Sequence, residues 1–168
     1  KRKIVCSKKS ITMKNYFRLL LFVFCITANA QTEIKKDYYP NGQLKYQIPY
    51  KNGLKNGIAI EYFENGKAKI METNFNGKLN GSFVEYYENG KVKSDVVYKD
   101  DKANGTYKTY YESGELSGET QFIDNEKFGI EKAYYENGQL KYESPYSKNQ
   151  INGIHTEYFE NGKTKFTI

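Results

Sequence analysis

One stretch decides the fold of this chain: Gly57-Ile58-Ala59-Ile60-Glu61-Tyr62-Phe63-Glu64-Asn65-Gly66-Lys67-Ala68-Lys69-Ile70-Met71-Glu72. Its central phrase is two aromatic residues followed by Glu-Asn-Gly, and six copies or close variants return at a step of 24 residues. The last residues of the six copies are Gly42, Gly66, Gly90, Gly114, Gly138 and Gly162. A constant step without insertions indicates one structural unit stacked on its neighbours. Such a chain has few unique residues for chemistry, so we do not expect an enzyme.

Each copy predicts a β-hairpin. Asn-Gly between two runs of aromatic and β-branched residues favours a two-residue type I′ turn, here at Asn65-Gly66, because both residues tolerate a positive φ. The fourth copy has Ser113-Gly114 instead. A second polar stretch, from Asn76-Gly77 to Asn80-Gly81, predicts a longer loop between hairpins. We expect hairpins at about 33–48, 57–72, 81–96, 105–120, 129–144 and 153–168.

Strand alternation then assigns two faces. If Glu64 pairs with Lys67 across the turn as an ion pair, Phe63 lies opposite Ala68 and Tyr62 lies opposite Lys69. The second aromatic of each copy would build an apolar face. The first aromatics would form the tyrosine row, which faces water beside lysines and consists of Tyr38, Tyr62, Tyr86, Tyr110, Tyr134 and Tyr158.

The predicted fold class is all-β: six tandem 24-residue hairpins that form one elongated, twisted antiparallel sheet of about 12 strands. Curling of the sheet would shelter the apolar column. We favour this open sheet over a closed barrel, because no obvious pair of strands would close it. No segment after the first 30 residues shows helical periodicity.

The first 30 residues stand apart from the repeats. Met13 begins a basic start, an apolar run follows, and Ala28-Asn29-Ala30 has the form of a cleavage site. We expect 1–12 to be a non-native upstream extension, 13–30 a signal peptide and 31–168 the repeat domain. An uncleaved anchor is the alternative. Cleavage would leave an exported protein, periplasmic or at the cell surface, that is not inserted in a membrane.

Trimming changes the charge. Seven of the 26 basic residues precede Gln31, which leaves 19 lysines, no arginine and 20 acids. Nucleic-acid recognition uses basic patches and arginine, so we expect no nucleic-acid partner. Cys6 and Cys25 also precede Gln31, so disulfides and thiolate metal sites are not expected beyond it.

Candidate catalytic groups are few. His155 is the single histidine, and its equivalents in four other copies are Ala59, Phe83, Tyr107 and Glu131. A column this variable indicates a packing or rim position more than a catalytic or metal-binding one. We expect no catalytic residue, metal or cofactor.

The unit Tyr-Tyr-Glu-Asn-Gly-Lys-x-Lys, followed by an aromatic residue and Asn-Gly-Lys-x-Asn-Gly, resembles the bacterial variant MORN-repeat family. The resemblance covers about residues 33–168. It implies hairpins in an elongated sheet and a scaffold or membrane-associated linker. Proteins of this family are often labelled antitoxin-like.

The tyrosine row is the one site-like feature of the sequence. Tyrosine is a good strand former that covers lysine stems, so the row has a purely structural interpretation. It also suits a protein interface. Our leading hypothesis is an exported, non-enzymatic scaffold for protein–protein interaction. The alternatives are a cell-surface glycan-binding module and an antitoxin or immunity protein that neutralises a toxin.

Overall fold

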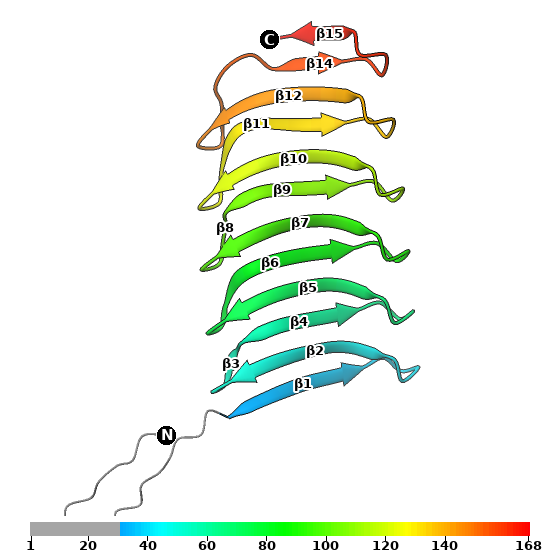
Figure 1. Ribbon diagram of the computed structural model, residues 1–168, viewed down its shortest axis with the longest axis vertical. Coiled ribbons are helices and arrows are strands. Elements are labelled where there is room, and N and C mark those ends of the chain that lie inside the picture. The colour runs from blue at the N-terminus through cyan, green and yellow to red at the C-terminus, as the bar shows by residue number, and fades with distance from the viewer. Residues whose placement is uncertain (1–30) are drawn as a thin grey trace, which may run out of the picture.

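The computed structural model describes residues 31–168, and these form one open antiparallel sheet in chain order (Figure 1). The strands of the main path are β1 (Thr32–Tyr38), β2 (Leu44–Lys51), β4 (Gly57–Tyr62), β5 (Ala68–Phe75), β6 (Lys78–Tyr86), β7 (Val92–Lys99), β9 (Gly105–Tyr110), β10 (Leu116–Ile123), β11 (Glu126–Tyr134), β12 (Leu140–Ser147), β14 (Thr156–Tyr158) and β15 (Thr164–Thr167). Three two-residue strands lie off this path: β3 (Leu54–Lys55), β8 (Lys102–Ala103) and β13 (Gln150–Ile151). The predicted all-β fold of six hairpins in a single sheet is confirmed. The predicted upstream extension and signal peptide lie outside the described residues.

The turn inside each hairpin is not the predicted type I′ turn. Gly66 N–H donates to the Phe63 carbonyl at 2.9 Å, and Phe63 N–H donates to the Lys67 carbonyl at 2.8 Å. Only the glycine of Asn65-Gly66 has a positive φ, +81°. This is a three-residue loop, a type I turn closed by a left-handed glycine. The two-residue prediction was therefore wrong by one residue of loop.

Type I′ turns lie instead between the hairpins, where the sequence predicted longer loops. Phe75 pairs with Lys78, so Asn76 and Gly77 alone form the connection, at φ of 50° and 84°. The same two-residue turn occurs at 52–53, 100–101, 124–125 and 148–149. The longer-loop prediction was wrong because the strands continue up to this turn: β5 ends at Phe75, beyond the expected residue 72.

The extra loop residue also corrects the predicted strand register. Tyr62 pairs with Ala68 and Glu61 pairs with Ile70, with a bulge between them. Lys69 therefore reaches Glu61, with Nζ and Oε1 2.7 Å apart. The predicted Glu64–Lys67 pair does not form within residues 31–168; Lys67 Nζ donates to the Asn89 carbonyl at 2.8 Å.

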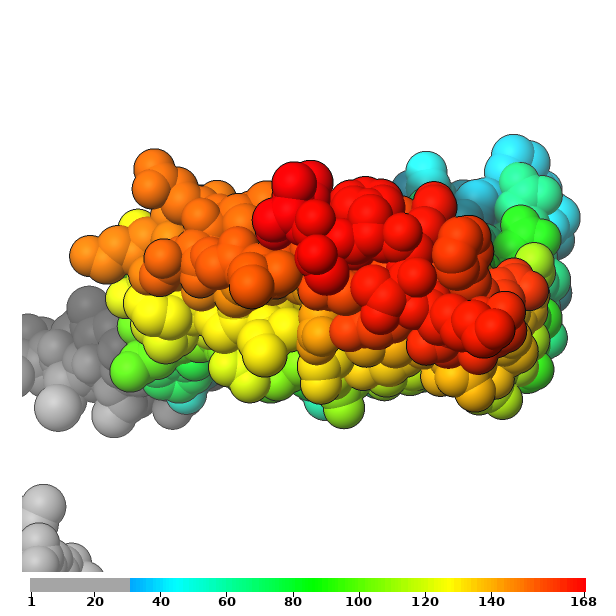
Figure 2. Space-filling model, turned by 90° about the horizontal axis from the view of Figure 1, so that it is seen from above, coloured from blue at the N-terminus to red at the C-terminus, as the bar shows by residue number. Residues whose placement is uncertain are grey.

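The sheet has two unlike faces. We call one the packed face, because alternation and register place on it all six buried side chains of residues 31–168: Ala59, Asn74, Ser94, Val96, Thr120 and Ser144. We call the other the tyrosine face, because it carries the tyrosine row. Ala59 and Val96 are the only buried hydrophobic residues, since no second layer covers either face of the part described. Seen along its long axis the molecule is a slab, wider than it is thick (Figure 2).

The second aromatics do not build the sheltered apolar column that the sequence predicted. They lie at the hairpin turns, and those that are tyrosines donate their hydroxyls to a backbone carbonyl of the next hairpin. Tyr87 Oη, for example, lies 2.7 Å from the Tyr110 carbonyl oxygen. The leucine, alanine and valine column instead shares a face with the tyrosine row, because Tyr62 stands opposite Ala68 and Tyr86 opposite Val92. None of the described residues belongs to a helix long and apolar enough to cross a membrane.

Candidate functional site

The structure places all six members of the tyrosine row on the tyrosine face. Tyr38, on the first strand, is 55% exposed, and the other five are half-buried. Their hydroxyls turn back toward the preceding hairpin: Tyr110 donates to Asp95 at 2.9 Å, Tyr134 to Glu119 at 2.9 Å, and Tyr158 to Glu143 at 2.7 Å. Burial and the Glu119 hydrogen bond raise the pKa of Tyr134 to about 12. The row therefore has a structural task, and its role in partner binding stays a prediction.

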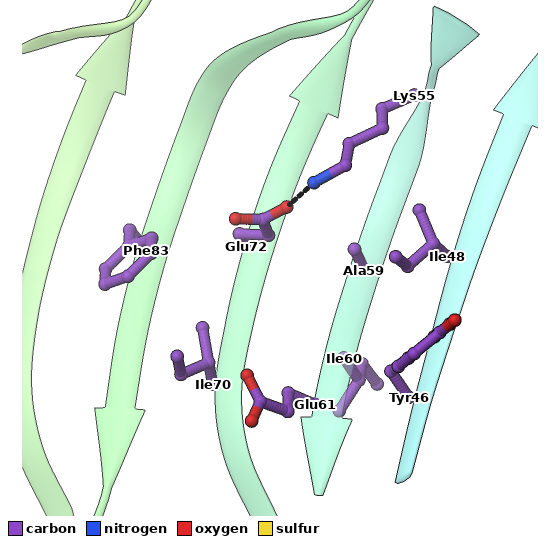
Figure 3. A pocket seen from close by; sticks show the side chains of 9 residues that line it. All are labelled: Tyr46, Ile48, Lys55, Ala59, Ile60, Glu61, Ile70, Glu72 and Phe83. Atoms are coloured by element: carbon purple, nitrogen blue, oxygen red, sulfur yellow. Dashed lines mark hydrogen bonds and ion pairs between the residues drawn. The ribbon is translucent and has the colours of Figure 1, made fainter. Parts of the chain in front are cut away.

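The packed face holds two shallow pockets that the sequence did not predict. The first has a volume of about 210 Å³ and lies over hairpins 1 to 3 (Figure 3). Ile48, Ala59 and Ile70 line its apolar part. A Lys55–Glu72 ion pair of 2.8 Å crosses one side, and Glu61 is held by Lys69. The carboxylates of this pocket are thus neutralised by lysines of the same chain.

The second pocket is larger, about 370 Å³, and lies over the next hairpins. Ser94 and Val96, 3% and 6% exposed, form its floor. Two edge-to-face aromatic pairs flank it: Phe83 with Tyr98, whose ring centroids are 5.9 Å apart, and Tyr107 with Phe122, at 6.3 Å. Glu85, Ala103 and Asn125 complete the lining.

Sequence reasoning missed these pockets because they depend on register. Phe83 and Tyr107 belong to the variable column of His155, and Tyr98 and Phe122 to a second column that the repeat phrase does not contain. The signal was present in the coincidence of aromatic residues in both columns in hairpins 3 and 4, which could be recognised only once the bulges had fixed which columns are neighbours.

His155 lies in a cluster of chemically interesting side chains. Its Nδ1 is 2.5 Å from Ser144 Oγ, and its Nε2 is 3.7 Å from Glu157 Oε1. The ring packs between Tyr142 and Phe166, with centroids 5.7 and 5.9 Å away. Ser144 is only 3% exposed, so its hydroxyl is closed to a substrate. The arrangement packs and satisfies a buried hydroxyl, and residues 31–168 hold no group of three acidic, His or Cys side chains suited to a metal.

The comparisons with known proteins identify the repeat. A family model described as the MORN repeat variant matches six segments, one for each hairpin: 34–52, 55–73, 79–100, 103–124, 129–148 and 151–168. No curated protein matches the chain. Repeats of this kind commonly mediate protein or lipid interactions, and the six-hairpin sheet is a repeat scaffold. The chain belongs to the MORN repeat variant family.

Proposed function

We propose that this protein is an exported, non-enzymatic scaffold that binds another protein through its packed face. The observation that carries the proposal is a one-layer sheet in which aromatic rings surround open pockets. Folded domains ordinarily bury a sheet face against a second layer. A packed face with half-buried tyrosine and phenylalanine side chains and no covering layer in residues 31–168 has the composition of an interface core.

The packed face supports this function better than the tyrosine row does. Tyrosines are effective anchors when their hydroxyls are free to meet a partner. In the row, the hydroxyls of Tyr110, Tyr134 and Tyr158 are committed to carboxylates of the same sheet. The rings around the second pocket make no hydrogen bond to the sheet among those found in residues 31–168, so both their faces and their polar tips remain available.

The test is photo-crosslinking in the cell that makes the protein. A benzophenone amino acid replaces either Phe122 on the packed face or Val97, which is 51% exposed on the tyrosine face. We expect Phe122 to crosslink one defined protein and Val97 to crosslink none. A third variant carries the probe at Tyr86 and tests the tyrosine row. Crosslinks from Tyr86 alone, or equal crosslinks from all three positions, would contradict the packed-face proposal.

Export is tested separately. A chain tagged at its C-terminus is fractionated, and the mature N-terminus is sequenced. We expect an envelope or secreted species that begins at Gln31. A protein recovered whole from the cytoplasm would contradict export while leaving the binding proposal open to its own test.

A further inference from the structure

The packed face already shows how this fold holds an ammonium group. Lys127 Nζ lies 2.7 Å from Glu131 Oε1 and 4.8 Å from the centroid of the Tyr146 ring. Lys55 Nζ lies 2.8 Å from Glu72 Oε1 in the first pocket. Both lysines occupy the same position of the 24-residue repeat. At that position, a lysine of the chain meets a carboxylate on the packed face.

In the second pocket the same repeat position is Ala103. The side chain that would bring an ammonium is absent, whereas the ring at the Tyr146 position is retained as Tyr98 and, one repeat later, as Phe122. The nine lining residues include one carboxylate, Glu85, and no cation. Within the described part of the chain this pocket combines aromatic walls with an acid that no lysine of its own lining neutralises.

Glu85 is oriented by its neighbours. Ser94 Oγ donates to Glu85 Oε2 at 3.0 Å, which ties the carboxylate to the pocket floor. The Lys69 ammonium feels the charge of Glu85 but donates its hydrogen bond to Glu61, at 2.7 Å. Glu85 therefore keeps Oε1 as an acceptor for a donor that enters from solvent.

The spacing of the aromatic side chains suits a cation between them. Phe83 on β6 pairs with Val96 on β7, and Val96 separates it from Tyr107 on β9. Two strand spacings place the Phe83 and Tyr107 columns about 10 Å apart. A cation midway would be about 5 Å from either column, within the ~6 Å reach of a cation–π contact.

We propose that the second pocket binds a lysine side chain of the partner protein, with the ammonium between Phe83 and Tyr107 and hydrogen-bonded to Glu85. This inference rests on the proposed function and names the chemical group that the packed face recognises. A primary ammonium has N–H donors for Glu85, which a quaternary ammonium such as choline lacks. The chain's own Lys55 and Lys127 show that the packed face accommodates this side chain.

The experiment is an NMR titration of the full chain with N-acetyl-lysine methylamide, observed at the ring resonances of Phe83 and Tyr107. We expect saturable shifts in the unmodified protein. Glu85→Gln should weaken binding at least tenfold, since it removes the charge and keeps the shape. Ala103→Lys should abolish binding, because the chain then fills its own pocket.

The matched control is Glu61→Gln. Glu61 occupies the repeat position of Glu85 but is already paired with Lys69, so this variant should bind the probe as the unmodified protein does. Equal losses in Glu61→Gln and Glu85→Gln would overturn the assignment, and so would equal shifts with the uncharged N-acetyl-norleucine methylamide. Tighter binding of phosphocholine than of the lysine probe would assign the pocket to a lipid headgroup instead. A crosslinked partner at Phe122 without lysine binding would overturn this inference alone.

Discussion

Lys148 is the least favourable residue of the type I′ turns. It has a φ of 50°, and its side chain makes no hydrogen bond or ion pair within residues 31–168. The equivalent residues are Asn52, Asn76, Asp100 and Asp124. Asparagine and aspartate tolerate the left-handed region, where a long side chain is strained.

Lys148→Asn should therefore stabilise the protein by about 0.5–1 kcal/mol. Urea denaturation followed by circular dichroism measures the gain as a higher midpoint at unchanged slope. The matched control is Lys163→Asn, since Lys163 is an exposed lysine outside the set of positive-φ residues. An equal gain in both variants would show that lost charge, and not backbone strain, is responsible.

Tyr134 gives the sheet a measurable alkaline transition. Burial and then the hydrogen bond to Glu119 raise its pKa from 10.0 to about 12. Below pH 10 the folded and unfolded chains both carry a neutral phenol, so the contribution of Tyr134 to stability is fully present. As the pH rises from 10 to 12, the unfolded chain ionises first and this stability is lost.

The test is titration of tyrosinate absorbance for the unmodified protein and for Tyr134→Phe. The variant should lose one late-titrating tyrosine near pH 12 and keep the amplitude near pH 10. If the variant instead loses amplitude near pH 10, the phenol of Tyr134 is not shielded in the folded sheet.

At the scale of the element, each hairpin is fastened to the next by the second aromatic of its turn. The Tyr39, Tyr87, Tyr111 and Tyr135 hydroxyls each donate to a backbone carbonyl 23 residues ahead. The second hairpin has Phe63 at this position and lacks the bond. One hydrogen bond contributes roughly 0.5–1.5 kcal/mol to stability.

Phe63→Tyr should add the missing bond and stabilise the protein by about 0.5–1.5 kcal/mol. Tyr87→Phe should remove one and destabilise the protein by a similar amount. Both are read from urea midpoints. A loss in both variants would mean that the Phe63 ring cannot take the orientation that Tyr87 has.

The turns show which local features the sequence could predict. Asn-Gly occurs both at 65–66 and at 76–77, yet the loops have three and two residues. The difference depends on the Asn65 side chain, which accepts from Lys67 N–H at 2.9 Å and donates to the Glu88 carbonyl at 3.1 Å. The second contact comes from the next repeat, so dipeptide preference alone could not distinguish the two turns.

At the scale of the molecule, the fold followed from the sequence and the pockets did not. An unbroken 24-residue step predicts the number of hairpins and their stacking, because every unit must present the same edges to its neighbours. A pocket depends on the side chains of neighbouring columns. Ala103, Phe83 and Glu85 come together only after the bulges set the register, so a register wrong by one residue hides them.

Stacking also makes repeats removable. Deletion of 81–104 joins Asn80 to Gly105, which recreates the Asn-Gly of Asn104-Gly105 and keeps the phase. We expect a folded sheet whose urea slope is lower by roughly one sixth, since that slope scales with the surface exposed on unfolding. Circular dichroism measures both properties.

The control deletes only 81–92, half of one repeat. It fuses two strands of opposite direction and should disrupt the sheet. A half-repeat variant as stable as the whole-repeat variant would show that the phase does not govern stacking.

The strands run across the long axis, and the first and last lie at its opposite ends (Figure 1). Tension applied between the two ends would therefore load one strand pair at a time, as in opening a zipper. Each step would release a 24-residue unit that extends to at most about 80 Å. The sheet would lengthen in regular increments at low force, so a partner held by one hairpin could be released mechanically while the remaining hairpins stay folded.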